Sequence, residues 1–353
     1  YSQRLTLTDH DYDFSCYISS MAAALTSSVW DVEAEDVPSD GTREEYARFL
    51  LRYAILAPSS HNSQPWEFAV RDDEIRIAAD ESRWLAAADP DKRELYISVG
   101  CAVENCCVAA EAFGFDPQVE YHDPESADHV VTVTLEETAP ANPRPADLFD
   151  ALTTRATSHE EFDDRPLAPD TRQQLERVVR DDNITLHLVD DSDTNDSISE
   201  LQAEADRLQM DDPAYRKELG HWIGLGALGS SWLAARIGQT VVTHLDIGDR
   251  EAKKNSKLIQ SAPVIALLTT ETDDATAQVR TGQAFERIAL LASARDLAVH
   301  PMSQTLERSE MRTRLADVFD TAENPQHLFR LGYTGATVDH TPRWPLEVFL
   351  DDA

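Results

Sequence analysis

The chain has 353 residues, of which 65 are Asp or Glu and 31 are Lys or Arg, so its formal net charge at pH 7 is -34. This balance excludes a nucleic-acid-binding protein, because phosphate backbones are bound through Lys and Arg. In dilute salt such a charge destabilises a compact state by self-repulsion, which is largely screened at roughly 1 M salt, where the Debye length is about 3 Å. The composition therefore predicts a halophilic protein of a high-salt cytoplasm.

Apolar residues make up 42% of the chain, enough for a globular core. No apolar run approaches the ~20 residues that span a bilayer, and the first residues lack the pattern of a signal peptide. The four cysteines (Cys16, Cys101, Cys106 and Cys107) form no CxxC pair, and the histidines form no HExxH motif. We expect a soluble cytoplasmic protein with core cysteines, no metal site and no membrane partner.

The first predicted element is an amphipathic helix over residues 42–54, opened by Thr42. Pro58 ends it, within the stretch APSSHNSQPW at residues 57–66, and an alternating strand is predicted at residues 75–78. The loop presents amides and hydroxyls that suit a polar, flat ligand. A capped turn leading into a strand has the same composition, so the residues alone leave both interpretations open.

An internal repeat relates two parts of the chain. Residues 100–112 and 282–294 have helical apolar spacing and are identical at five of thirteen positions, at an offset of 182. Three residues of the first helix recur in a helix that begins at Thr171, at an offset of 129. The strand that follows at residues 184–189 is matched to the strand at residues 75–78. The offsets differ by 53 residues, which predicts an insertion of that size at about residues 190–260. We therefore predict two halves, residues 1–145 and 146–353, although degenerate helix patterns can also produce such a likeness.

Two common enzyme signatures do not apply to this chain. GLGALG at residues 224–229 satisfies GxGxxG, but no strand precedes it, so the dinucleotide fingerprint is rejected. The GxSxG elbow of serine hydrolases is absent. The Gly-rich stretch is instead interpreted as a mobile segment of the insertion, and residues 220–229, with Trp222 and Trp232, are the candidate for the tip of that insertion.

The stretch at residues 57–66 resembles the PSxxNxQPW signature of the FMN-dependent nitroreductase family. The resemblance implies that this loop contacts a flavin ring through five residues, Pro58, Ser59, Ser60, Asn62 and Gln64. In the second half, RATSHEEF is similar to the family's RxSxR motif, which places Arg155, Thr157 and His159 at positions that hold the flavin's ribityl phosphate. His159 stands where the family has Arg. Each half keeps a motif that the other lacks.

Two C-terminal stretches extend the resemblance. VHPMSQ, residues 299–304, matches the family's Pro-led loop, so Pro301, Met302 and Ser303 are implied to meet the flavin, with the Ser303 N–H donating to flavin N5. RLGYTG at residues 330–335, followed by TPRWPLEVF, is similar to the family's closing pattern and assigns Arg343 to the phosphate. Without the other motifs, Arg343 would be interpreted as a solvated surface arginine.

Residues 80–94, DESRWLAAADPDKRE, resemble the two-lobed Acg branch of this family. The branch implies an α+β fold, a nitroreductase-like three-layer α-β-α sandwich, in which two tandem halves form a pseudo-dimer within one chain. The insertion would then cover the flavin as a lid. One chain would hold one FMN, and the monomeric pseudo-dimer is expected to suffice, with further dimerisation left open.

The resemblance implies an FMN-dependent oxidoreductase that transfers hydride from NAD(P)H, through flavin N5, to a nitroaromatic or quinone-like small-molecule acceptor. No side chain is expected to act as a catalytic acid or base, because the flavin carries the chemistry. An alternative from another class is a flavin-sequestering or storage protein whose lid closes the FMN site and which lacks reductase activity. A third alternative is a structural protein that has lost FMN. The presence of His159 where the family motif has Arg would favour this alternative.

Overall fold

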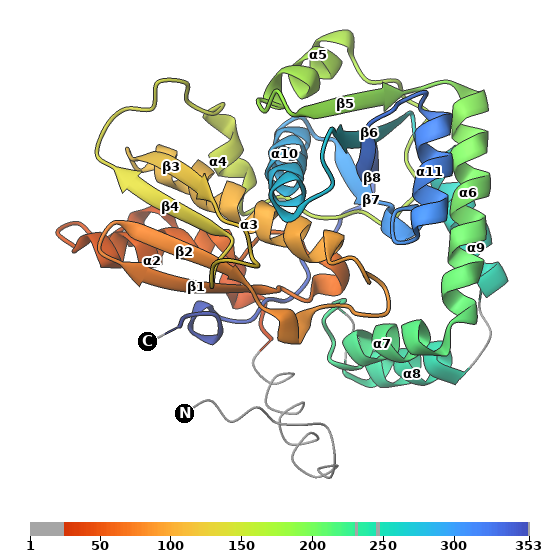
Figure 1. Cartoon of the computed structure of the whole chain (residues 1–353), viewed down its shortest axis with the longest axis horizontal. Helices are drawn as coiled ribbons and strands as arrows, with labels where there is room; N and C mark the ends of the chain where they lie inside the picture. Colours follow the sequence, from red (N-terminus) through yellow and green to blue (C-terminus); the bar gives the residue numbers. More distant parts are fainter. Residues whose placement is uncertain (1–24, 230–231, 245–247, 352–353) are drawn as a thin grey trace.

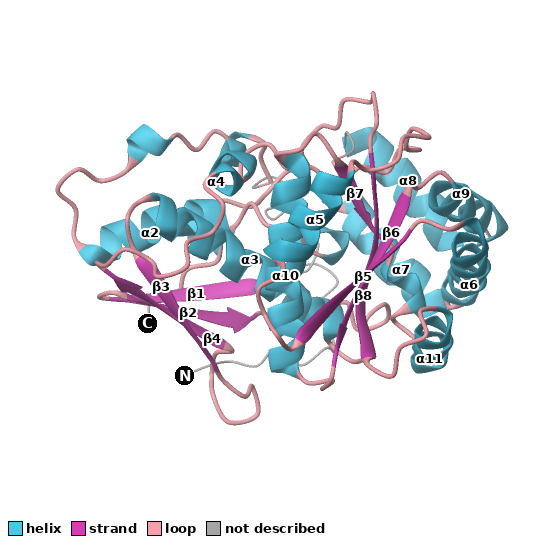
Figure 2. Cartoon of the chain, turned by 90° about the horizontal axis from the view of Figure 1, so that it is seen from above, coloured by secondary structure: helices cyan, strands magenta, loops and turns pink. Residues whose placement is uncertain are grey.

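The computed structural model describes residues 25–229, 232–244 and 248–351. It contains two four-stranded antiparallel sheets, with the long helices α3 and α10 side by side between them (Figure 1). Helices cover one face of the first sheet and both faces of the second (Figure 2). The fold is therefore mixed α+β and is built from two halves.

In the first half, the 3-10 helices η1 (Ser28–Trp30) and η2 (Ala34–Asp36) precede α2 (Arg43–Ala54), which lies where a helix was predicted. The Thr42 hydroxyl accepts from the Glu45 backbone N–H at 3.2 Å and the Glu45 carboxylate accepts from the Thr42 N–H at 2.7 Å, so a capping box fixes the helix start. The short 3-10 helix η3 (Ser60–Asn62) follows. The remaining elements are β1 (Trp66–Arg71), β2 (Glu74–Ala79), α3 (Arg93–Ala112), β3 (Asp116–Tyr121) and β4 (Val131–Glu136), and the sheet order is β1-β2-β4-β3.

The second half repeats this plan with the sheet order β5-β6-β8-β7. Its elements are α4 (Asp147–Ala151), α5 (Pro169–Val178), β5 (Ile184–Val189), β6 (Val264–Thr270), α10 (Ala275–Ser293), β7 (Ala298–Pro301), the 3-10 helix η5 (Ser303–Thr305), α11 (Ser309–Val318) and β8 (Asn324–Gly332). The same antiparallel order in both sheets supports the internal repeat.

The sheet order corrects the strand correspondence that the sequence comparison used. Strand β5 occupies the edge position of β1, whereas the comparison matched it to residues 75–78, which lie in β2. The true partner of β2 is β6, which the sequence analysis did not predict. Every residue of β6 is buried, so its sequence VIALLTT lacks the alternation that identifies a half-exposed strand.

Between β5 and β6 the described residues form four helices, where the first half has only the turn at Asp72 and Asp73. They are α6 (Ser192–Asp211), α7 (Pro213–Gly224), α8 (Trp232–His244) and α9 (Gly248–Gln260), and we refer to them as the lid. Helices α6 and α9 pack on each other beyond the second sheet, and α7 packs on α8 (Figure 1).

The two halves meet where α3 crosses α10, at the glycines of the repeat. A Cβ on Gly100 would lie 2.0 Å from the Val279 carbonyl oxygen, and one on Gly282 would lie 2.0 Å from the Ile97 carbonyl oxygen. Helix α3 is long and apolar enough to cross a membrane, which the sequence analysis did not recognise, and 89% of its apolar window is buried inside the protein. Its composition is accounted for by its place in the core.

Other residues predicted for the core lie there too. Cys101, Cys106 and Cys107 are buried free thiols on α3, as predicted, while Cys16 lies outside the described residues. The C-terminal segment leaves β8 and returns to the first half, where the Phe68 N–H donates to the Phe349 carbonyl oxygen at 2.7 Å. The tail of the second half thus extends the edge of the first sheet.

Because of the net charge of -34, we expect the stability of this fold to depend on salt. Raising KCl from 0.2 M to 2 M is expected to increase the melting temperature, because screening removes repulsion that the compact state suffers more than the unfolded chain does. Differential scanning calorimetry at fixed pH measures the shift. An unchanged or falling melting temperature would count against the repulsion argument.

Candidate functional site

Two buried arginines of the second half converge on the loop that follows α2. The Arg155 Nη2 group donates to the Leu56 carbonyl oxygen at 3.4 Å, and the Arg343 Nη2 group donates to the carbonyl oxygens of Leu56 at 3.2 Å and Ala57 at 3.1 Å. Arg343 also donates from Nη1 to the Thr341 hydroxyl at 2.6 Å. Both arginines predicted to hold the phosphate therefore meet at one place, beside the predicted flavin loop.

The charge around these arginines is not balanced. Glu286 on α10 is fully buried with Oε1 3.2 Å from the Arg155 Nε, and burial raises its pKa to about 7, although Arg155 opposes the rise. Burial, and then repulsion from Arg155, lowers the pKa of Arg343 to about 9. The Arg343 Nε lacks a hydrogen-bond partner among the described residues. Two guanidinium groups thus face one partly ionised carboxyl, and a bound phosphate fits this excess of positive charge.

The repeat-related residue Glu104 on α3 has different surroundings. Its carboxylate accepts from the Arg144 Nε at 2.6 Å and from the Arg287 Nε at 2.6 Å. Burial alone would raise its pKa, but these two arginines hold the pKa of Glu104 well below its usual range. Arg144 also pairs with Glu111 at 2.5 Å, so two arginines face two carboxylates and the charge around Glu104 is balanced within the protein. The unbalanced cluster is therefore confined to the Glu286 side.

The loop after α2 has an unusual backbone. His61, Asn62 and Gln64 have φ angles of 49°, 53° and 52°, in the left-handed region that residues other than glycine rarely adopt. The Ser59 hydroxyl accepts from the Gln64 N–H at 2.9 Å and the Ser98 hydroxyl accepts from the Ser60 N–H at 3.3 Å, so the conformation is held from two sides. Strain of this kind concentrates at functional sites.

The amide side chains of this loop contact protein, not open space. The Asn62 Nδ2 group donates to the carbonyl oxygens of Ala227 in the lid and of Pro342, both at 2.8 Å. The Gln64 Oε1 atom accepts from the Trp344 N–H at 3.1 Å. The Asn62 Oδ1 atom has no hydrogen-bond partner among the described residues. Pro58, Ser59 and Ser60 are half-buried.

Thr157 and His159 have other neighbours than Arg155 does. Thr157 forms a β-bridge with Val299, next to β7. The His159 ring lies 4.4 Å from the His300 ring, and the Arg330 Nε donates to the His300 Nδ1 at 3.0 Å. The contacts that the structure gives these two residues are with the β7 region, so only Arg155 of the three-residue motif reaches the Leu56 carbonyl.

The three residues of the Pro301–Ser303 stretch also differ from one another in their contacts. The Met302 N–H donates to the Leu328 carbonyl oxygen at 2.8 Å, so the second sheet uses the Met302 amide. Pro301 has no N–H to donate. The Ser303 hydroxyl is hydrogen-bonded to the buried Glu94 carboxylate at the start of α3. Of the three, Ser303 is the residue that connects this stretch to the first half.

The lid closes over these loops through α7. The Glu218 carboxylate accepts from the N–H groups of Ala87 at 3.0 Å and Ala88 at 2.9 Å. Buried Trp222 makes an edge contact with Trp344, with ring centroids 6.5 Å apart. The Gly-rich stretch at residues 224–229 ends α7 and follows no strand, which supports rejection of the nucleotide fingerprint. The predicted neighbour Trp232 has its side chain outside the described residues.

Sequence reasoning missed Glu286 and Glu94 as members of this site. Glu286 carried a signal, because it matches Glu104 in the repeat and both are acidic residues on otherwise apolar helices. An acid that lies inside a core helix needs a charged partner. Which arginine supplies that partner depends on how α3 and α10 pack.

Glu286 makes stability depend on pH with a definite sign. Its pKa rises from 4.5 to about 7 on folding, so the folded state binds the proton more tightly and stability falls as pH rises between these values. The loss is on the order of 3 kcal/mol. Urea unfolding at pH 5 and at pH 8 measures the free energy of unfolding at each pH. The difference between the two values should be smaller in Glu286→Gln than in the wild type. Burial also raises the pKa of Asp89 to about 7, so part of the dependence of stability on pH should persist in the variant. A pH dependence as steep as that of the wild type would contradict the assignment to Glu286.

Comparison with known proteins finds relatives over most of the chain. "Putative NAD(P)H nitroreductase Rv3131" of Mycobacterium tuberculosis is 28% identical over 310 residues, 85% of this chain and 89% of that protein. "Putative NAD(P)H nitroreductase acg" of the same organism is 24% identical over 332 residues, 89% and 98% of the two chains. No family model matches. An NADPH:FMN oxidoreductase structure from Vibrio harveyi has a TM-score of 0.40 and 10% identity, covering 58% of this chain and 76% of its own. That structural likeness is too weak to support an inference.

Proposed function

We propose that this chain, which belongs to the Acg-like branch of the nitroreductase family, is an FMN-binding oxidoreductase that takes hydride from NAD(P)H and reduces a nitroaromatic or quinone-like acceptor. The observation that carries the proposal is the buried excess of positive charge at Arg155 and Arg343, beside the loop that resembles the family signature. A chain with a net charge of -34 repels anions, so a buried cationic cluster points to a specific one.

The two halves would contribute different parts of the cofactor site. Arg155 and Arg343 would bind the phosphate, while the Pro58–Gln64 loop and Ser303 would hold the ring. The bound flavin supplies the hydride and electron transfer. The protein's part is to position the cofactor, to keep water out through α7, and to hold Ser303 through Glu94. Because both halves of one chain supply the site, we propose that a single chain suffices for binding.

A flavin-sequestering protein is the second candidate, and the lid contacts favour it. Asn62 on the flavin loop donates to Ala227 in the turn after α7, and Glu218 within α7 is held by two backbone N–H groups of the first half. A lid fixed at both places would shut the ring away from NAD(P)H. The difference between the two candidates is therefore the rate at which the lid opens.

Anaerobic mixing with NADH or NADPH in molar KCl separates the two candidates. Rapid loss of the oxidised flavin absorbance supports the oxidoreductase, while persistence of the oxidised spectrum supports sequestration. Glu218→Ala should accelerate bleaching if the lid limits access, and Glu44→Ala, which removes an exposed ion pair with Arg48 within α2, is the control. A colourless protein that takes up no added FMN would contradict both candidates.

A further inference from the structure

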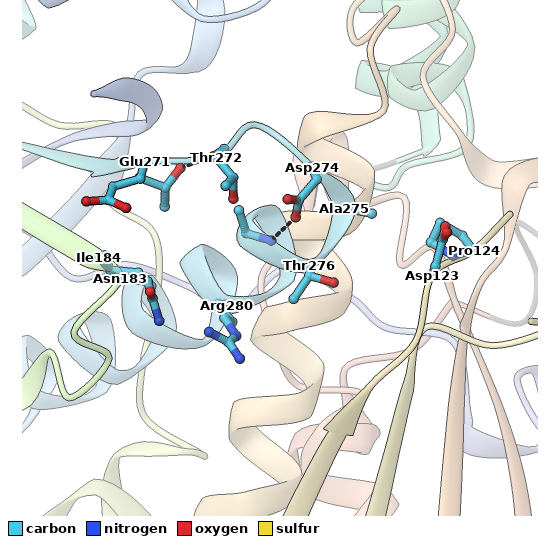
Figure 3. A pocket seen from close by; sticks show the side chains of 12 residues that line it. Asp123, Pro124, Asn183, Ile184, Glu271, Thr272, Asp274, Ala275, Thr276 and Arg280 are labelled. Atoms are coloured by element: carbon cyan, nitrogen blue, oxygen red, sulfur yellow. Dashed lines mark hydrogen bonds between the residues drawn. The ribbon is translucent and has the colours of Figure 1, made fainter. Parts of the chain in front are cut away.

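A cavity of about 550 Å³ lies on the side of the molecule where α10 begins. It lies between the start of α10, the start of β5 and the loop after β3, and both halves line it (Figure 3). The residues whose polar groups line it include Asp123, Asn183, Glu271, Asp274, Thr276 and Arg280. Its volume falls within the range of small-molecule sites.

The internal repeat relates this cavity to the pocket beside the proposed flavin loop. Four of its lining residues lie 182 positions after four residues that line a nearly filled pocket of about 10 Å³ next to Ser60. The pairs are Asp89 and Glu271, Glu94 and Thr276, Leu95 and Ala277, and Ser98 and Arg280. Each half therefore has a pocket at the equivalent position, and the pocket is nearly filled beside the flavin loop and open at the start of α10.

The lid explains why only one of the two is closed. On the flavin side, α7 is fixed through Glu218 to the backbone N–H groups of Ala87 and Ala88, immediately before Asp89. On the other side, the equivalent connection is the turn at Asp72 and Asp73, which carries no helix. The second position is thus left open to solvent.

One end of the cavity is suited to a carboxylate. Helix α10 has 19 residues, and the N–H groups of its first turn lack intrahelical acceptors; Asp274 caps only that of Ala277, at 2.9 Å. The Arg280 guanidinium lies 4.6 Å over the Tyr121 ring and 3.6 Å from Asp181, and its buried Nε has no hydrogen-bond partner among the described residues. Arg280 and Thr276 replace the counterparts Ser98 and Glu94, which makes this end more positive.

The remaining surface is acidic and apolar. Asp123 and Glu271 line the cavity and form no ion pair with any part of the chain that the structure describes, although the Asp123 carboxylate accepts from the Glu125 N–H at 2.9 Å. Pro124, Ile184 and Ala275 supply apolar surface. A ligand that used the whole cavity would carry an anionic group, a cationic group and an apolar part.

We propose that this cavity binds a small zwitterion with an apolar side chain, such as an α-amino acid. The carboxylate meets Arg280 and the start of α10, the ammonium group meets Asp123 or Glu271, and the side chain lies against the apolar surface. An anion alone is repelled by the carboxylates of Asp123, Glu271 and Asp274, and a cation alone leaves Arg280 and the start of α10 without an anion. The proposal does not depend on flavin binding.

Three matched probes test the charge requirement by calorimetric titration in molar KCl. Phenylalanine is expected to bind, while 3-phenylpropionate and phenethylamine, which each keep one of its charges, are expected to bind at least tenfold more weakly. Absence of phenylalanine binding at millimolar concentration would overturn the proposal. Binding of either single-charge probe as tightly as phenylalanine would also overturn it.

Two variants locate the site. Arg280→Gln should weaken phenylalanine binding at least tenfold. Thr276→Glu restores the counterpart residue, places a negative charge beside the carboxylate and should abolish binding, while it remains folded because an acid in the first turn stabilises a helix. Arg314→Gln, at an exposed ion pair on α11, is the matched control. Unchanged phenylalanine binding in folded Thr276→Glu would refute the site.

Discussion

Gly282→Ala is expected to destabilise the protein by about 3 kcal/mol, near the upper end of the cost of overpacking a core. The added Cβ would lie 2.0 Å from the Ile97 carbonyl oxygen and 2.9 Å from the Gly100 Cα. Both obstacles are backbone atoms of α3, so neither can turn away as a side chain would. The gain in helix propensity from glycine to alanine, about 1 kcal/mol, is too small to offset this clash.

Gly335→Ala is the matched control, because no heavy atom lies within 4 Å of its added Cβ. Denaturant unfolding should show a lower midpoint for Gly282→Ala and a midpoint close to wild type for Gly335→Ala. Gly100→Ala should behave like Gly282→Ala, since its Cβ would meet the Val279 carbonyl oxygen at 2.0 Å. A Gly282→Ala protein of wild-type stability would show that α3 and α10 do not cross at these glycines.

The crossing of α3 and α10 also determines where the functional residues lie. Glu286 lies four residues after Gly282 on α10, and Glu104 lies four residues after Gly100 on α3. Each carboxylate is therefore close to the axis that relates the halves. The arginines around Glu104 complete a buried ion-pair network, whereas the arginines around Glu286 have an excess of positive charge. A symmetric scaffold has become asymmetric through its charged side chains.

Local signals in the sequence predicted many of the elements. The helix that begins after Thr42 was predicted from its amphipathic spacing and its opening threonine, and β5 was predicted at residues 184–189, where it occurs. Strand β6 was missed because both of its faces are covered, which removes the alternation that identifies a strand. The strand correspondence was wrong because it requires knowledge of the sheet order, which is a tertiary property.

The candidate site was predicted unevenly for a related reason. Motif spacing identified Arg155 and Arg343, which lie 188 residues apart in the sequence and both donate to the Leu56 carbonyl in the structure. Motif spacing did not identify Glu286, whose role depends on which side chains face it across the core. It also gave Met302 a role although its amide is used within the sheet. Flavin binding by these residues remains a prediction.

Arg155→Ala is expected to weaken FMN binding about 10- to 100-fold, which corresponds to the loss of one charge-assisted contact of ~1.5 to 3 kcal/mol. Arg343→Ala should have an effect of similar size, because both guanidinium groups lie at the Leu56 carbonyl. The measurement is the ratio of flavin to protein after gel filtration in molar KCl, followed by titration with added FMN. Full flavin stoichiometry in Arg155→Ala would contradict the phosphate assignment.

The repeat supplies a control that separates binding from folding. Arg287→Ala removes a buried partner of Glu104, at 2.6 Å, on the side whose charge is already satisfied. That variant should lose stability because the buried Glu104 carboxylate keeps an incomplete set of partners. Its flavin content should nevertheless stay near one per chain while it remains folded. If Arg155→Ala and Arg287→Ala lost flavin equally at equal stability, the loss would report the packing of α3 on α10, and the cationic cluster at Arg155 and Arg343 would have no special role in holding the phosphate.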